Sequence, residues 1–194
     1  TLNGAGNGNT TIDLGAGVTA GFVIFDTASA AGYTIGSGAV GSQTLTLDGN
    51  TTANLSLTAT VSNAQAVNAN ITASMSGNTM RVSNLSTQAL AINGAITSSS
   101  TKTMNVTTTT GGGNVTFNGG IGDGTAAFVV ANIGSGNLTL SGSGTSTLST
   151  LRATQAGAKV IVNGQTVNVA SQSDYANGGI LEVQSGSATF SNNI

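Results

Sequence analysis

The sequence predicts an all-β fold, and three observations lead to this prediction. Apolar residues alternate with Thr, Ser or Asn, as in the stretch Leu55-Ser56-Leu57-Thr58-Ala59-Thr60-Val61, which has the period of a half-buried strand. Similar stretches recur about every ten residues and are separated by Gly, Asn and Ser. Proline is absent from all 194 residues, which favours continuous strand pairing because proline removes a backbone donor.

The alternating stretches define the expected strands in chain order. They cover residues 44–47, 55–61, 71–75, 80–82, 90–92, 104–106, 115–117, 138–140, 160–162, 167–169 and 181–183. Each has one apolar face and one polar face, and the β-branched residues in them favour a pleated, half-buried surface. The only helical candidates, 27–31 and 64–67, are too short to be stable alone. No linker interrupts the pattern, so residues 1–194 are expected to form a single elongated β domain.

Two topologies fit this strand pattern. Leu90-Ala91-Ile92-Asn93-Gly94-Ala95-Ile96 matches the stretch 115–121 at an offset of 25, and Leu45-Thr46-Leu47-Asp48-Gly49 echoes the stretch 138–142. Units of this size are typical of a parallel β-solenoid, or β-helix, whose eight or nine stacked coils would span roughly 40 Å. However, Asn163-Gly164 and Asp48-Gly49 also fit tight hairpins. An antiparallel β-sandwich with edge-strand exchange therefore remains the alternative.

Composition excludes several classes of function. The chain has no His and no Cys, which excludes the usual zinc sites, a Cys nucleophile and a Ser-His-Asp triad. Only four residues are Lys or Arg and six are Asp or Glu, too few for a nucleic-acid surface. The longest apolar stretches, 22–25 and 128–131, are too short to span a bilayer. We expect no enzyme activity, no cofactor, no metal, no nucleic-acid partner and no membrane span.

Four motifs carry possible chemistry, and each has a simpler explanation. Gly36-Ser37-Gly38-Ala39-Val40-Gly41 matches a dinucleotide fingerprint, but a strand is expected after it instead of the required helix. Gly119-Gly120-Ile121-Gly122-Asp123 approaches a calcium-binding repeat without a tandem copy. Thr1 lacks the neighbours of an N-terminal nucleophile. Paired carboxylates for glycoside cleavage would need Asp13 with Asp26, or Asp174 with Glu182, in one cleft.

The remaining polar and aromatic residues favour structural roles. Isolated cations are expected to keep the surface soluble or to block strand edges; they are Arg81, Lys102, Arg152 and Lys159. Asparagines on the strands are expected to form polar faces or stacked side-chain ladders. The aromatic residues Tyr33, Tyr175 and Phe190 are expected to pack in the core or at corners.

Three stretches resemble the autotransporter-associated β-strand repeats of large bacterial surface proteins. They are Val115-Thr116-Phe117-Asn118-Gly119-Gly120-Ile121, Gly136-Asn137-Leu138-Thr139-Leu140-Ser141-Gly142 and Gly178-Gly179-Ile180-Leu181-Glu182-Val183. The resemblance covers residues 90 to 190. It implies a right-handed parallel β-helix, export from the cell and an adhesive or surface role. The repeats here are more irregular than those of the family, and the resemblance supplies no catalytic residues.

Strand edges without protection lead to a prediction about assembly. Edge strands usually carry charge or proline, which prevents pairing between molecules; this chain has no proline and few charges, and neither end carries a charged cap. The assembly edges are predicted at Leu2, Ile12, Leu14, Phe190 and Ile194. We therefore expect a non-enzymatic structural protein of the bacterial surface or extracellular matrix, which self-associates through these edges into a filament. The alternative is an adhesin segment that binds glycan or a host surface.

Overall fold

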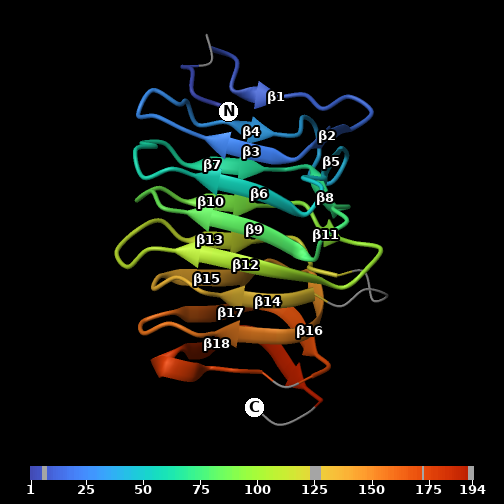
Figure 1. Cartoon of the computed structure of the whole chain (residues 1–194), viewed down its shortest axis with the longest axis vertical. Coiled ribbons are helices and arrows are strands. Elements are labelled where there is room, and N and C mark those ends of the chain that lie inside the picture. Colours follow the sequence, from blue (N-terminus) through green and yellow to red (C-terminus); the bar gives the residue numbers. More distant parts are fainter. Residues whose placement is uncertain (6–7, 123–127, 172, 192–194) are drawn as a thin grey trace.

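The chain forms a parallel β-solenoid of about seven turns. This computed structural model describes residues 1–5, 8–122, 128–171 and 173–191. Every pairing between its strands is parallel, and the coils are stacked along one axis with the N-terminus at one end and the C-terminus at the other (Figure 1). The predicted fold class is therefore confirmed, whereas the antiparallel sandwich is wrong.

Each coil passes through three faces in the same order. The first face holds β1 (Thr11–Ile12), β4 (Thr34–Ile35), β7 (Gln65–Val67), β10 (Leu90–Ile92), β13 (Val115–Phe117) and β15 (Asn137–Ser141). The second holds β2 (Val18–Ala20), β5 (Thr44–Leu47), β8 (Asn70–Ala73) and β11 (Ile96–Thr97). The third holds β3 (Phe22–Phe25), β6 (Thr52–Leu57), β9 (Thr79–Asn84), β12 (Lys102–Thr108) and β14 (Phe128–Asn132).

Near the C-terminal end, single long strands turn the corners between faces. β16 (Thr145–Ala153) runs from the second face to the third through a register shift opposite Phe128 and Val129. β17 (Lys159–Val169) and β18 (Ile180–Phe190) each run from the first face to the second. Apart from the strands, the described residues contain one regular element of more than a single residue, the short 3₁₀ turn Ala176–Gly178. No α-helix occurs at 27–31 or 64–67.

The hairpin interpretations fail for one physical reason. Asn163-Gly164 lies inside β17, where Gly164 has a φ of 108° and turns the strand around a corner. A positive φ suits a solenoid corner as well as a hairpin, so the dipeptide alone could not distinguish them. Asp48-Gly49 joins β5 on the second face to β6 on the third, and the positive φ of 62° at this corner belongs to the next residue, Asn50.

The 25-residue repeat is real, while the second echo is not a coil repeat. Leu90 pairs with Val115, and Ile96 bridges to Ile121, so the two matching stretches occupy adjacent coils. In contrast, Leu45 lies on the second face and Leu138 on the first.

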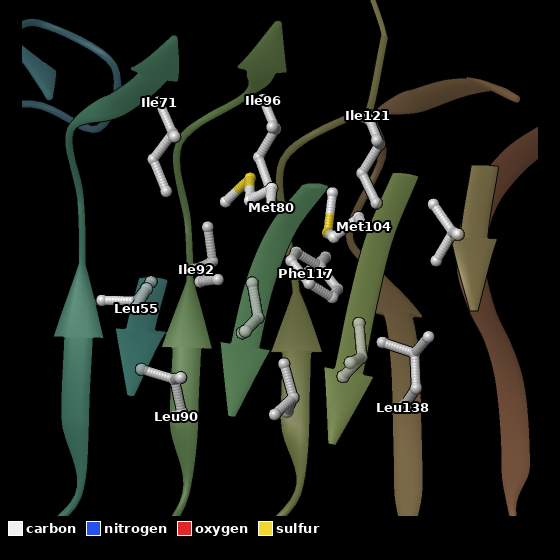
Figure 2. Packing of buried hydrophobic residues seen from close by; sticks show 14 of the residues in the cluster. Leu55, Ile71, Met80, Leu90, Ile92, Ile96, Met104, Phe117, Ile121 and Leu138 are labelled. Atoms are coloured by element: carbon white, nitrogen blue, oxygen red, sulfur yellow. The ribbon is translucent and has the colours of Figure 1, made fainter. Parts of the chain in front are cut away.

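Inward-facing side chains form continuous rows through the interior. On the first face one row contains Ile35, Val67, Ile92, Phe117, Leu140 and Val162, all nearly or fully buried. In Figure 2, side chains from the three faces point into one core, among them Ile92 and Phe117 from the first face, Ile96 from the second, and Met80 and Met104 from the third. The alternation predicted from the sequence thus separates a dry core from a polar surface.

Some partly or fully buried polar groups join the coils. Asn93 donates from Nδ2 to Oδ1 of Asn68 at 2.7 Å and accepts from Nδ2 of Asn118 at 2.6 Å. The expected asparagine ladder therefore forms, but just beyond the ends of β7, β10 and β13 instead of on the strands. Lys102 corrects an expectation, because it is buried instead of solvating the surface or blocking an edge. Its Nζ donates to the carbonyl oxygens of Met75 (2.7 Å) and Gly77 (3.0 Å).

Candidate functional site: the two ends of the solenoid

The N-terminal end of the solenoid exposes its core. β1, β2 and most of β3 are each paired on one side only within the described part of the chain. Together they surround an apolar hollow of about 180 Å³. Its lining includes Leu2, Ile12, Leu14, Val18, Ala20 and Phe22. Large apolar side chains in contact with water favour association, since burying one contributes roughly 1.5–3 kcal/mol.

The exposure is greatest at two of these side chains. Val18 is 43% exposed and Phe22 is 58% exposed. The next members of the inward row on the second face, Leu45 and Ile71, are almost completely buried. Val18 is therefore a core position that lacks only the coil above it.

Residues 2–4 cover one part of this end. Leu2 bridges to Phe25 in parallel, donates its N–H to the carbonyl of Ile24 at 2.6 Å and accepts from the N–H of Asp26 at 3.0 Å. The carbonyl of Gly4 accepts from the Tyr33 hydroxyl at 2.8 Å. This segment therefore adds a partial strand to the third face, while β1 and β2 remain uncovered.

The C-terminal end also presents an open strand. β18 pairs with β17 along the first and second faces, and its other edge has no partner among the described residues. The inward side chains Leu181, Ala188 and Phe190 pack against the core and are only partly buried. Val183, which continues the row of Val162, is 50% exposed. This end is therefore apolar as well.

The acidic side chains near both ends bond back to their own molecule. The Asp13 carboxylate accepts from the Gly15 N–H at 2.8 Å and from the Gln43 amide of the next coil, and these bonds lower the pKa of Asp13. The Glu182 carboxylate accepts from the Gln184 amide at 2.7 Å and forms an ion pair of 3.4 Å with Lys159 of the preceding coil. These contacts, the Gln184 bond first, lower the pKa of Glu182. Both carboxylates are therefore held by bonds within their own molecule.

The residues predicted as assembly edges fall into two groups. Leu2, Ile12 and Leu14 line the same N-terminal hollow, although Leu14 is only 7% exposed and lies beneath its rim. Phe190 is at the opposite end, as the last residue of β18. Ile194 lies outside the described residues. Their role in assembly stays a prediction.

Other residues at the ends were missed from the sequence. Phe22, Val183, Ile180 and Val18 are the most exposed large apolar side chains of the open ends. Phe22 belongs to an apolar run that does not alternate, so the alternation rule does not identify it. Val18-Thr19-Ala20 does alternate, but it is only three residues long. The apolar run at residues 22–25 is the signal that could have identified β3.

The motifs with possible chemistry are not assembled into a site in the described part of the chain. Gly36, Gly38 and Gly41 all have positive φ and lead into the strand β5, so they form a turn. Asp123 of the calcium-like motif lies outside the described residues. The structure contains no cluster of three or more Asp, Glu, His or Cys side chains among the residues it describes. Asp13 follows β1 and Asp26 follows β3, which places them on different faces.

The second acidic pair and the tyrosines are also separated by the fold. Asp174 bridges to Arg152 of the third face, whereas Glu182 lies in the first-face half of β18. Tyr33 is buried with its ring 6.4 Å from that of Phe25, so it packs as expected. Tyr175 packs against the core, and burial raises the pKa of its hydroxyl.

Comparisons with protein-family models, curated proteins and solved structures found no match to this chain. The resemblance to autotransporter repeats therefore stays a prediction. Within the described ranges, no helix has the length and hydropathy needed to cross a bilayer.

Proposed function

We propose that this chain is a non-enzymatic structural protein of the bacterial surface or extracellular matrix, and that copies associate end to end into a filament. The observation that carries this proposal is the pair of open apolar ends. The hollow of about 180 Å³ at one end, and at the other the edge of β18 that pairs with no described residue, each leave core positions in water. A second copy of the chain supplies matching core at both places.

The direction of the strands supports a head-to-tail contact. Because all the strand pairs are parallel, a copy added along the axis in the same orientation continues the same parallel pairing. Joining two identical ends would instead require antiparallel pairing. A head-to-tail contact between unlike surfaces that does not close into a ring produces a filament.

Composition supports an extracellular location. The chain combines very few charges with no cysteine, and its surface consists largely of Thr, Ser, Asn and Gly. The resemblance to autotransporter repeats agrees with export. We therefore place the filament outside the cell, at the surface or in the matrix.

Charge substitution at the ends tests this function. Val18→Lys and Val183→Lys each place an ammonium group in an open end, at positions exposed enough to leave the coil intact. Leu85→Lys is the matched control, since Leu85 is 45% exposed and follows β9 on the flank. Sedimentation velocity and electron microscopy should show filaments for the wild type and Leu85→Lys, and dispersed monomers for the end variants. Wild-type protein that stays monomeric at high concentration would contradict the proposal.

A polar cleft favours one second candidate, an adhesin segment that binds glycan. The cleft has a volume of about 220 Å³ and lies among corner loops, with Thr109, Thr110, Asn114, Ser135 and Asn137 in its lining. Hydroxyl and amide groups of this kind can bond sugar hydroxyls. An array of glycans tests it: binding by the wild type that Asn114→Ala and Asn137→Ala remove would support this function, and an array without signal would reject it.

A further inference from the structure

The terminal strands at the two ends occupy different faces of the solenoid, so the two ends have complementary shapes. This inference rests on the proposed function and specifies how two copies fit together. At the N-terminal end, Leu2 pairs with Phe25 at the end of β3, and Gly4 accepts hydrogen bonds from Ala31 and Tyr33 in the connection to β4, while no described residue pairs with the open edges of β1 and β2. At the C-terminal end, β18 occupies the first and second faces. The described chain ends at Ser191, and up to that residue nothing that follows β18 lies on the third face. One end thus offers the part of a coil that the other end lacks.

The register of the inward rows fixes where the two ends meet. The first-face row begins at Ile12 and runs coil by coil to Val183. The second-face row begins at Val18, and on the same face at the far end it includes Val167 and Ala188. If each row continues into a second copy, Val183 of the first copy lies against Ile12 of the second. In the same way, Ala188 of the first copy lies against Val18 of the second. Phe190 then meets Ala20, because both lie two residues further along.

We propose that β18 of one copy pairs in parallel with β1 and β2 of a second copy in this register, and that residues 2–4 of the second copy form the last part of the shared coil, at the end of the third face. The proposal rests on end-to-end association as the function. Its distinguishing feature is a single register for the junction.

Side-chain sizes favour this register. Val18, which protrudes from the N-terminal end, meets the small Ala188. Phe190, which is large and only partly buried, meets the small Ala20 in the lining of the hollow. Alternating large and small residues across a contact is what allows a core to fill without voids. A shift by one residue would turn every inward side chain outward.

The corner between the faces also matches. The step from Val183 to Ala188 is five residues, whereas the step from Ile12 to Val18 is six. The molecule already stacks coils that differ by this amount. The step from Leu140 to Ser146 is six residues and lies against the step of five from Val162 to Val167, and the difference is taken up over residues 142–144, between β15 and β16. The junction therefore needs no geometry that the fold lacks.

Charges do not oppose the contact. The outward-facing neighbours of Val183 and Ile12 also meet in this register. Gln184 of one copy lies beside Asp13 of the next, and Glu182 lies beside the neutral Thr11. The Gln184 amide can donate to a carboxylate, and no two like charges face each other in this register.

Disulfide trapping tests the register directly, because the chain contains no native cysteine. Thr19 and Thr189 face outward beside Val18 and Ala188, and both are exposed. In the proposed junction they become neighbours on adjacent strands, about 4.8 Å apart, within the Cα separation that a disulfide needs. Inside one molecule they lie at opposite ends, so the bond can form only between copies.

The double variant Thr19→Cys with Thr189→Cys should form a ladder of covalent oligomers under mild oxidation, and dithiothreitol should collapse it to monomers. The matched control, Thr19→Cys with Ser187→Cys, moves one thiol two residues along the exposed part of β18 and should give at least ten-fold less product. Filaments in which the control pair links as well or better would overturn the register while leaving the function standing. Absence of any association, by sedimentation and by trapping, would overturn both.

Discussion

The substitution Gln165→Leu should weaken the solenoid more than any surface change of similar size. Gln165 follows the corner at Gly164 and is fully buried. Its Nε2 lies within hydrogen-bond distance of three carbonyls, those of Phe117 (2.8 Å), Gly119 (3.0 Å) and Ser141 (2.8 Å), and its two N–H groups are shared among them. Its Oε1 accepts from the Ser146 hydroxyl at 2.6 Å. One side chain therefore joins three successive coils.

The expected cost follows from the three hydrogen bonds that this amide makes, two donated by its N–H groups and one accepted by its oxygen. A buried hydrogen bond contributes about 1 kcal/mol net, and a group left unsatisfied costs more. Leucine keeps most of the packing volume but bonds none of the four partners, so the free energy of unfolding should fall by about 3 kcal/mol. The Ser146 hydroxyl, which also accepts from the Ile121 N–H at 3.1 Å, loses its acceptor in the same step.

Urea unfolding followed by far-UV circular dichroism measures this effect. Thr166→Val is the matched control, because Thr166 is the next residue on β17 and is exposed. It should change the free energy of unfolding by less than about 0.5 kcal/mol. A Gln165→Leu midpoint equal to that of Thr166→Val would refute the reasoning.

Three further predictions concern the core, the ladder and pH. Phe117→Ala empties a fully buried site between two coils and should cost about 3–5 kcal/mol by urea unfolding, whereas Phe22→Ala at an exposed end should cost much less. Asn93→Ala removes two ladder bonds and should cost about 1–2 kcal/mol in the same assay; an unchanged midpoint would show that the ladder is passive. The folded-state pKa of Glu182 is lowered from its ordinary value of 4.5. The stabilisation by this carboxylate is therefore present above about pH 4.5 and lost as the pH falls through the lowered pKa. Melting curves from pH 7 to pH 3 should show a smaller acid destabilisation for Glu182→Gln than for the wild type.

Strands with clear alternation could be predicted because each strand turns one side toward the core and the other toward solvent. Residues 90–92, 115–117 and 138–140 coincide with or lie within β10, β13 and β15. β3 and β14 were missed as strands because their apolar runs, 22–25 and 128–131, do not alternate. In β14 the inward-facing Val130 is followed by Ala131 and Asn132, which are also buried.

Strand order and coil number were harder to predict. Asn163-Gly164 has the same local chemistry in a hairpin and in a solenoid corner, and only the parallel partners of β17 distinguish the two. The first-face offset rises to 32 between Thr34 and Ala66 and falls to 21 between Ile161 and Glu182. This variation hides the repeat, so the expected eight or nine coils exceed the seven turns observed.

The candidate site was predicted in outline only. The lack of charge at the ends indicated open edges, and Leu2, Ile12 and Leu14 do lie together. The complementary shapes of the two ends could not be predicted from the sequence, since they depend on which face each terminal strand occupies. The burial of Lys102 was equally hidden, because its two carbonyl partners come from the preceding coil.

The axial repeat of the assembled material tests the central claim most directly. The first face carries eight strands from β1 to β18, so the β1 strands of successive copies should be separated by eight steps of about 4.8 Å, or roughly 38 Å. Cryo-electron microscopy of filaments should therefore show this repeat together with a continuous 4.8 Å strand spacing across the junctions. Filaments whose copies are side by side or alternate in direction, or a solution of monomers only, would contradict the account.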